Sequence, residues 1–141
     1  MEKIYKIKDN LYIGSYRAIK KLKKLRKEGI TAIVNLMEKR KYDPRPEFEY
    51  LFKPIKDRTY ISYEDLHEIL SFIDQKIRNG KVLVHCHSGI SRSGGIMVAR
   101  LLIENPDWTW EQARKFVRKV IKISPHPNIK KSILDYLESI K

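Results

Sequence analysis

Residues 82–95, VLVHCHSGISRSGG, place the single cysteine of the chain between an apolar run and a loop of small residues. The run that ends at His85 is short and continuously apolar, which is typical of a central strand in a parallel sheet. The stretch from Gly95 to Ile103 is apolar on nearly all sides and is predicted to be a buried helix. This order places Cys86 at the carboxyl end of a strand, where ligands bind in α/β sheets.

The loop at residues 86–92, which we call the cradle, is suited to hold a tetrahedral dianion. Glycine and serine let the backbone curl so that its N–H groups point inward, and the following helix contributes the positive end of its dipole. Arg92 can return across the loop and hold two oxygens of a phosphate with its planar guanidinium. The same positive field favours the nucleophilic thiolate form of Cys86. The residues predicted to contact the anion are His87, Ser88, Gly89, Ile90, Ser91 and Arg92.

Three other interpretations of this loop explain less. A lone buried cysteine is usually a small hydrophobic residue, but that leaves the ordered glycines, serines and arginine without a reason. A metal site is disfavoured because His85 and His87 point away from Cys86 along a strand, and the other two histidines lack ligand spacing. A nucleotide-binding loop needs Gly-Lys-Ser/Thr, and residues 89–92 have no lysine. We therefore expect no metal and no other cofactor.

The rest of the chain alternates predicted strands and helices. Strands are expected at residues 10–13, 31–36, 50–52 and 81–85, and helices at 16–28, from Ser62 to the Asn79-Gly80 stop, 95–103, 109–122 and from a cap at Asn128. Alternation of this kind indicates an α/β fold. We expect a single domain over residues 1–141, with a central, mainly parallel, twisted sheet flanked by helices.

The composition excludes several classes of protein. No apolar run approaches the ~20 residues of a membrane span, and the start lacks the apolar core of a signal peptide. One cysteine in 141 residues excludes an internal disulfide and fits a reducing, cytoplasmic setting. The net charge of +13 is mostly solvated surface, as at residues 20–29, but it also attracts anionic partners. The composition, rich in Lys, Ile and Glu, is similar to that of hyperthermophile proteins. A monomer is expected.

The sequence HCHSGISRS at residues 85–93 resembles the HC-x5-R-S/T signature loop of the protein tyrosine phosphatases, and most closely that of their dual-specificity branch. The resemblance covers nearly the whole chain. Residues 10–14 are similar to the opening strand of that branch and residues 33–36 to its next core strand. Residues 53–57 are similar to the segment with its general acid, and residues 123–128 to the turn before its last helix. The resemblance implies a protein tyrosine phosphatase-like fold.

The resemblance also implies a mechanism. Cys86 attacks phosphorus and forms a cysteinyl-phosphate, so that one difficult step becomes two easier ones. Arg92 and the cradle amides bind the equatorial oxygens and stabilise the charge of the transition state. Asp57 gives a proton to the leaving oxygen and then acts as the base on the hydrolytic water, and such help is worth about 10²–10⁴-fold in rate.

Other residues have supporting roles by the same resemblance. Ser93 is expected to hydrogen-bond the thiolate and ease breakdown of the phospho-enzyme, although its hydroxyl could equally cap the following helix. His85 is expected to order the loop, and Asn35 to brace it from the neighbouring strand. Asp43, in a charged loop, is the serious rival of Asp57 for the role of general acid.

The expected substrates are phosphorylated proteins. The loop before Asp57 is short, which predicts a shallow pocket that admits phosphoserine and phosphothreonine as well as phosphotyrosine. Tyr42 or its neighbours could form a rim on which a ligand ring stacks. An RNA 5′-phosphatase, or a nucleotide or inositol phosphatase on the same fold, stays open because of the basic charge, so a nucleic acid is an alternative partner but not the favoured one. A non-catalytic phosphate-binding module is the second alternative.

Overall fold

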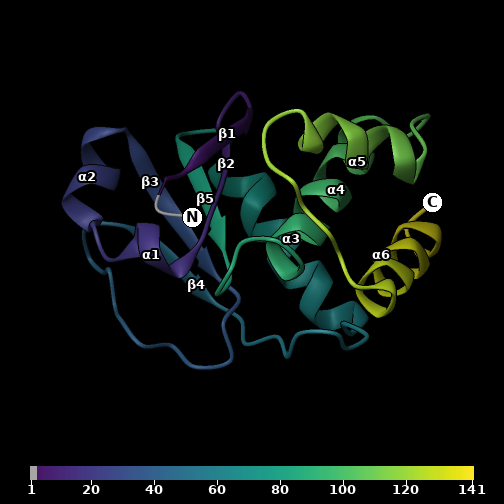
Figure 1. Cartoon of the computed structure of the whole chain (residues 1–141), viewed down its shortest axis with the longest axis horizontal. Coiled ribbons are helices and arrows are strands. Elements are labelled where there is room, and N and C mark those ends of the chain that lie inside the picture. The colour runs from purple at the N-terminus through teal and green to yellow at the C-terminus, as the bar shows by residue number, and fades with distance from the viewer. Residues whose placement is uncertain (1–2) are drawn as a thin grey trace.

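Five strands form one sheet, in the order β1-β2-β5-β3-β4, in a computed structural model that describes residues 3–141 (Figure 1). Four of them run parallel, and these are β2 (Leu11–Gly14), β5 (Lys81–His85), β3 (Ile30–Asn35) and β4 (Glu49–Phe52). The edge strand β1 (Tyr5–Lys8) is antiparallel to β2. The prediction of a mainly parallel sheet is confirmed. The edge strand was not predicted, because four residues give too short a pattern.

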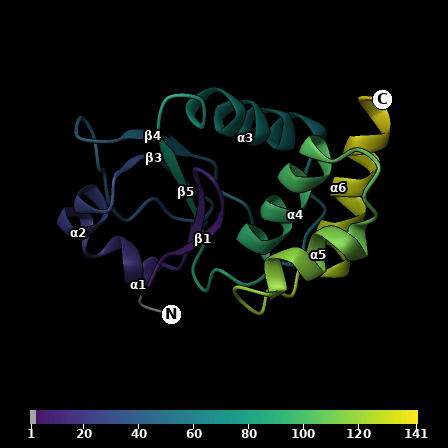
Figure 2. The same ribbon diagram turned by 90° about the horizontal axis from the view of Figure 1, so that it is seen from above.

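Helices cover both faces of the sheet (Figure 2). On one face lie the short helices α1 (Tyr16–Ile19) and α2 (Leu22–Lys27). The other face carries α3 (Tyr63–Lys76), α4 (Arg92–Glu104), α5 (Trp110–Arg118) and α6 (Pro127–Ser139). Successive strand residues point to opposite faces. Ile33 and Leu83 therefore belong to the smaller core under α1 and α2, whereas Val34 and Val84 belong to the larger one. None of the helices within residues 3–141 is long and apolar enough to cross a membrane.

The prediction of one helix over residues 16–28 was wrong. The chain leaves helical geometry at Lys21, where φ is −114° and ψ is 58°. Ile19 and Leu25 are both buried against the same side of the sheet. Six residues of continuous helix would turn these two side chains to different faces. The break resolves that conflict, because each short helix orients its own apolar residue toward the core.

Other helix boundaries also differ from prediction. The helix predicted over residues 109–122 ends at Arg118, and the chain then turns so that Ile123 is buried beside Gly94. The helix after the cradle begins at Arg92 rather than at Gly95, and the N–H of Gly95 already donates to the carbonyl of Ser91 at 2.9 Å. The last helix begins at Pro127, with His126 rather than Asn128 as its N-cap. Proline suits the first helical position, because its missing N–H would have no helical partner there.

The helix α4 forms the centre of the larger core and fixes the position of the cradle. Its residues from Arg92 to Leu102 are all buried. A Cβ atom at Gly95 would lie only 2.8 Å from Cγ2 of Ile129, and one at Gly94 would lie 2.8 Å from Cβ of Ile123. Glycine at both positions therefore lets the first turn of α4 pack closely against α6 and the segment before it.

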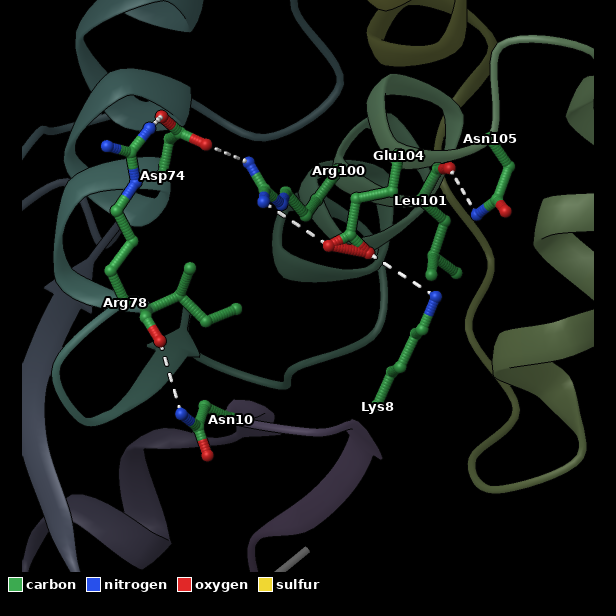
Figure 3. A network of polar contacts seen from close by, with 9 residues as sticks. Lys8, Asn10, Asp74, Arg78, Arg100, Leu101, Glu104 and Asn105 are labelled. Atoms are coloured by element: carbon green, nitrogen blue, oxygen red, sulfur yellow. Dashed lines mark hydrogen bonds and ion pairs between the residues drawn. The ribbon is translucent and has the colours of Figure 1, made fainter.

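A network of ion pairs holds the other end of α4 (Figure 3). The buried guanidinium of Arg100 donates to Asp74 on α3 at 2.9 Å and pairs with Glu104 at 3.2 Å. Glu104 lies 3.7 Å from the ammonium of Lys8 on β1, and Asp74 also pairs with Arg78 at 2.8 Å. Arg100 lowers the pKa of Asp74, with help from Arg78. Removing one partner of a buried ion pair leaves an uncompensated charge, so the network fixes α4 between α3 and the edge strand.

Candidate active site

The cradle begins where β5 ends, and its sulfur is buried. Cys86 is only 1% exposed. The chain then curls through Gly89, whose φ of +80° lies in the left-handed region that glycine adopts without steric cost. This conformation lets the N–H of Gly89 donate to Sγ of Cys86 at 3.2 Å. The loop therefore turns a backbone donor toward the sulfur of Cys86.

The carbonyl groups of the cradle are bonded from outside. The carbonyl of His87 accepts from the N–H of Tyr16 in α1 at 3.1 Å, and that of Ile90 accepts from Ser124 at 3.1 Å. Two segments distant in sequence therefore hold the loop with its carbonyls turned away from the centre. Because peptide N–H and C=O groups point in opposite directions, this arrangement leaves N–H groups available to an anion.

Arg92 joins the cradle to two other segments. Its Nη1 donates to the carbonyl of Ile55 at 2.9 Å and to that of Leu36 at 3.4 Å. Its Nε is buried and has no hydrogen-bond partner within residues 3–141. A guanidinium has five N–H donors, so two carbonyls orient the group while other donors stay available for an oxyanion. Ile55 lies two residues before Asp57, so Arg92 contacts the segment that contains the predicted acid.

Ser93 has a buried hydroxyl that lacks a hydrogen-bond partner within residues 3–141. The alternative that it caps the helix was wrong, because α4 begins at Arg92 and has Ser91 as its N-cap residue. A buried hydroxyl without a partner costs free energy, and such a group in a native structure needs a reason. A ligand or an ionised sulfur at the cradle would supply one.

His85 holds the backbone at the nucleophile and is uncharged at neutral pH. Its Nδ1 lies 3.2 Å from the carbonyl oxygen of Cys86, which can only accept, so Nδ1 carries the proton. Its Nε2 is then the acceptor for the hydroxyl of Tyr42 at 2.6 Å. Burial, aided by the charge of Arg92 and opposed by the bond to the carbonyl, lowers the pKa of His85 to about 4. His85 therefore orders the loop without adding positive charge.

Tyr42 is a site residue whose role the sequence did not indicate. Tyr42 or its neighbours were expected at the rim as a surface for a ligand ring. The hydroxyl of Tyr42 turns inward to His85 instead, so a rim formed by its neighbours stays a prediction. Burial first, and then the neighbouring Tyr50, raises the pKa of Tyr42, so the hydroxyl stays protonated and remains a donor. No sequence signal pairs these residues, which lie 43 positions apart.

Asn35 lies beside the cradle through the sheet, where it pairs with His85 in register. Its side chain, however, binds the loop that follows its own strand. Nδ2 donates to the carbonyl of Arg40 at 3.0 Å and to the hydroxyl of Tyr50 at 2.9 Å, and Oδ1 accepts from the N–H of Met37 at 2.9 Å. These contacts brace residues 37–40, which lie next to the cradle, rather than the cradle itself.

Asp57 lies in an irregular stretch, residues 53–61, which we call the acid segment. Its Oδ1 accepts from the backbone N–H of Arg58 at 2.8 Å, and Arg58 has a φ of +66°. Two contacts from α6 hold this turn. The side chain of Asn128 donates to the carbonyl of Arg58 at 2.9 Å, and the hydroxyl of Tyr60 donates to Asp135 at 2.7 Å. The partners are 70 and 75 residues apart, so no local pattern indicates them.

The rival acid, Asp43, is committed to an ion pair. Its carboxylate accepts from Nε and Nη2 of Arg45 at 2.9 and 2.8 Å, and from the backbone N–H of Arg45 at 3.0 Å. These bonds from Arg45 hold the pKa of Asp43 well below its ordinary value. Both oxygens of the Asp43 carboxylate are therefore occupied by Arg45, whereas the Asp57 carboxylate accepts from the Arg58 N–H, which leaves Asp57 as the better candidate.

A cavity of about 350 Å³ opens beside the cradle. It is lined by Met37, Glu38, Lys39, Lys41, His87 and Arg92. Three of its lining side chains carry a positive charge at neutral pH and one carries a negative charge, so the opening favours an anion. Residues 3–141 contain no group of three or more His, Cys, Asp or Glu side chains placed to hold a metal ion. The arrangement places a cysteine sulfur, backbone donors and a guanidinium at one loop, and these groups suit the binding of a phosphate next to a nucleophile.

Several known proteins are similar to this chain in sequence. A family model described as the catalytic domain of dual specificity phosphatases matches residues 11–139. Human dual specificity protein phosphatase 16 is 34% identical over 140 residues, which cover 96% of this chain and 21% of that protein. The chain therefore spans about a fifth of the length of this relative.

Solved structures agree with the fold. Tk-PTP in its active form is 28% identical to this chain, with a TM-score of 0.82 over 96% of each chain. The human tyrosine phosphatase-like serine/threonine/tyrosine-interacting protein is also 28% identical, with a TM-score of 0.84 over 99% of this chain and 98% of that one. Both alignments include the sheet and the helices that position the cradle.

Proposed function

Since the chain belongs to the dual-specificity phosphatase catalytic-domain family, we propose that it hydrolyses phosphate monoesters on proteins through a cysteinyl-phosphate intermediate. The observation that carries this proposal is the environment of the buried Cys86 sulfur. A backbone N–H of the cradle donates to it, and the guanidinium of Arg92 is held in place by two carbonyl groups with other donors available. The proposal concerns this chain, which is shorter than its relatives.

The first step transfers the phosphoryl group to sulfur. The thiolate of Cys86 attacks phosphorus in line, the S–P bond forms and the P–O bond to the leaving group breaks. Asp57 donates its proton to the leaving oxygen. The cradle amides and Arg92 hold the three other oxygens, and they bind most strongly when negative charge shifts in the transition state.

The second step releases phosphate. A water molecule attacks phosphorus, its proton passes to the carboxylate of Asp57, and the S–P bond breaks to regenerate the thiolate. The buried hydroxyl of Ser93 is suited to donate a hydrogen bond to the departing sulfur, which supports its role in this step. Neutral His85 holds the carbonyl of Cys86 throughout and stays out of the proton transfers.

We propose phosphotyrosine, phosphoserine and phosphothreonine proteins as the substrates. The short acid segment and the small cavity beside the cradle support a pocket that is open to all three side chains. We propose further that the protein acts as a monomer in the cytoplasm and needs no cofactor, because Arg92 and the amides neutralise the phosphate. With a single cysteine, oxidised Cys86 has no internal partner for a disulfide, and a reducing compartment would protect it.

A phosphate-binding module without turnover is the second candidate. One observation favours it: a human structural neighbour at 28% identity carries a name that describes a phosphatase-like interacting protein. Against it, this chain retains Cys86 in the cradle and Asp57 in the segment whose Ile55 carbonyl accepts from Arg92. Binding alone would require neither Cys86 nor Asp57.

Hydrolysis of an aryl phosphate without added metal separates the two candidates. We expect turnover by the wild-type protein in the presence of a chelator, and none by Cys86→Ser, which should still bind a phosphotyrosine peptide. A general acid must be protonated, so wild-type kcat/KM falls as rising pH removes that proton. Asp57→Asn should lose this alkaline limb. Peptide binding by the wild-type protein with no turnover at any pH would establish the binding module instead.

A further inference from the structure

A second hollow adjoins the cradle on the other side of His87. It has a volume of about 690 Å³ and lies between α1, the cradle and the segment after α5. We call it the flank groove, and the residues that line it include Tyr5, Tyr16, Arg17, Lys20, Ile90 and Lys122. His87 lines both this groove and the cavity beside the cradle. A substrate whose phosphate occupies the cradle can therefore extend its neighbouring residues into the groove.

The flank groove combines an apolar floor with a cationic rim. Tyr5, Ile90 and Ile121 contribute apolar surface, and Ile90 is 41% exposed although it belongs to the cradle. Arg17 and Lys20 come from the beginning of the chain, and Lys122 comes from beyond α5. An extended peptide presents alternate side chains to opposite sides, so apolar residues can face the floor while acidic ones reach the rim.

The cations of this rim are not neutralised by the protein. None of the ion pairs formed within residues 3–141 involves Arg17, Lys20 or Lys122. No carboxylate from the described residues, 3–141, lines the groove. Elsewhere the chain does pair its cations, as with Arg100 at the far end of α4 and Lys53 beside Glu68. The positive potential at the rim is therefore available to an external anion.

Tyr16 holds the rim in a defined place beside the cradle. Its backbone N–H donates to the carbonyl of His87 at 3.1 Å, so α1 is attached directly to the phosphate loop. The ammonium groups of Lys20 and Lys41 lie 5.1 and 5.4 Å from the centre of its ring. Such cation–π contacts restrict the lysine side chains, and binding costs less when the charged groups are already ordered.

We infer that the flank groove binds an acidic stretch of the substrate, so that the preferred substrates are phosphoproteins with Asp or Glu next to the phosphorylated residue. The inference rests on the proposed phosphatase activity and specifies its substrates. Peptide is favoured over RNA, because single-stranded RNA is recognised by stacking bases on open aromatic faces. The ring of Tyr16 is already contacted by two ammonium groups, and the floor contains aliphatic side chains.

Two phosphotyrosine peptides test this inference. They are identical except that one carries Asp and Glu beside the phosphotyrosine and the other carries Asn and Gln. For the wild-type protein we expect kcat/KM to be about tenfold higher for the acidic peptide than for the neutral one, because the cationic rim attracts the acidic peptide electrostatically. The ratio of the two kcat/KM values should fall with added salt, which screens this attraction. The triple variant Arg17→Ala/Lys20→Ala/Lys122→Ala should bring this ratio close to one.

The matched control removes the same charge from a different surface. Lys23, Arg26 and Lys27 lie exposed on α2 and outside the groove, so Lys23→Ala/Arg26→Ala/Lys27→Ala should keep the wild-type ratio. An equal fall in the ratio for both triple variants would overturn the inference, since overall charge would then explain the preference. Thermal unfolding of both variants checks that they are folded.

The remaining outcomes separate this inference from the proposed function. Equal hydrolysis of the two peptides by the wild-type protein overturns the flank groove as an acidic subsite and leaves the phosphatase proposal intact. Failure to hydrolyse either peptide or a small aryl phosphate overturns the phosphatase proposal itself. RNA with a 5′-triphosphate is the third probe. If the wild-type protein hydrolyses this RNA in preference to the acidic peptide, and if only the groove variant loses that preference, the groove binds nucleic acid and the inference is overturned.

Discussion

The cradle and the acid segment would share the proposed reaction, yet the structure holds them in different ways. The cradle lies between β5 and the buried helix α4, and Cys86 is 1% exposed. The acid segment crosses between β4 and α3 (Figure 1). Its Ile55 and Ile61 are buried in the core, whereas the stretch between them lies at the surface, where Tyr60 is 52% exposed. Its two contacts with α6 are made by exposed side chains.

The difference separates two physical requirements. Stabilisation of a developing charge needs dipoles that are fixed before the reaction, because reorganisation would cost free energy in the transition state. A group that gives and takes a proton must exchange with solvent between steps. Segments with few buried contacts open locally at low free-energy cost. The core therefore supports the cradle, and the surface supports the acid.

Apart from the loss of turnover expected for Cys86→Ser, replacement of Asp57 gives the largest expected change. We expect Asp57→Asn to lower kcat by about 10²–10⁴-fold for an aryl phosphate with a poor leaving group. The midpoint of thermal unfolding should change little, because the Asp57 side chain accepts only one backbone bond, from Arg58. Asp43→Asn is the matched control and should retain the wild-type rate. An equal loss of rate in both variants would contradict the assignment of Asp57 as the general acid.

Titration of His85 should make the free energy of unfolding fall at acidic pH. Its pKa is lowered from the ordinary 6.5 to about 4 in the folded protein, so the unfolded chain binds more protons between these values. The stabilising contribution is fully present above pH ~6.5 and is lost as the pH falls toward ~4. The difference in pKa corresponds to about 3 kcal/mol in the free energy of unfolding.

Urea unfolding at pH 7 and pH 4 measures this effect. His85→Gln should lose about 3 kcal/mol less than the wild-type protein between the two pH values, because the variant lacks the titrating group. His67→Gln, at an exposed position of α3, should keep the wild-type dependence. The same pH dependence in all three proteins would contradict a neutral buried His85.

A methyl group at Gly95 tests the close packing behind the cradle. The added Cβ would lie 2.8 Å from Cγ2 of Ile129 and 3.1 Å from Cδ1 of Ile133. We expect Gly95→Ala to lower the free energy of unfolding by about 1–3 kcal/mol, since overpacking exceeds the gain in helix propensity. Ser71→Ala on the exposed face of α3 should stay within about 0.5 kcal/mol of wild type.

A second substitution shows whether that cost is steric. Ile129→Leu keeps the side-chain volume but removes the branch that Gly95→Ala would meet. The double variant should therefore be destabilised by less than the sum of the two single variants. Simple additivity in urea unfolding would mean that the two positions do not press on one another.

The smallest effect is expected from the contacts that hold the acid segment. Asn128→Ala removes the bond to the carbonyl of Arg58 and should lower kcat for a poor leaving group by about two- to tenfold, the range of one hydrogen bond. In an Asp57→Asn background the same change should have no further effect, because both act on one proton transfer. Asn79→Ala, in the turn after α3, is the control. If Asn128→Ala lowers kcat by the same factor in the Asp57→Asn background, Asn128 affects something other than this proton transfer.

Much of the fold was predictable from short stretches of sequence. The parallel strands around Cys86, the buried helix after it and the start of a helix at Thr109 follow from periodicity and local hydrogen bonding. The predicted helix boundaries were wrong where tertiary packing overrode the local sequence pattern. At Lys21 the need to bury both Ile19 and Leu25 breaks the helix, which neither stretch indicates alone.

The sequence by itself determined the order of strand, loop and helix, the nucleophile Cys86 and the arginine six residues after it. Those features depend on neighbours along the chain, because the curl of the loop and the helix dipole are local properties of the backbone. Only the tertiary structure decided that Tyr42 bonds His85, that Arg92 rests on the carbonyl of Ile55 and that α6 holds the acid segment. Every residue has a backbone carbonyl, and the sequence distance to a non-local hydroxyl is not fixed. Such hydrogen-bond partners therefore cannot be recognised from a sequence pattern.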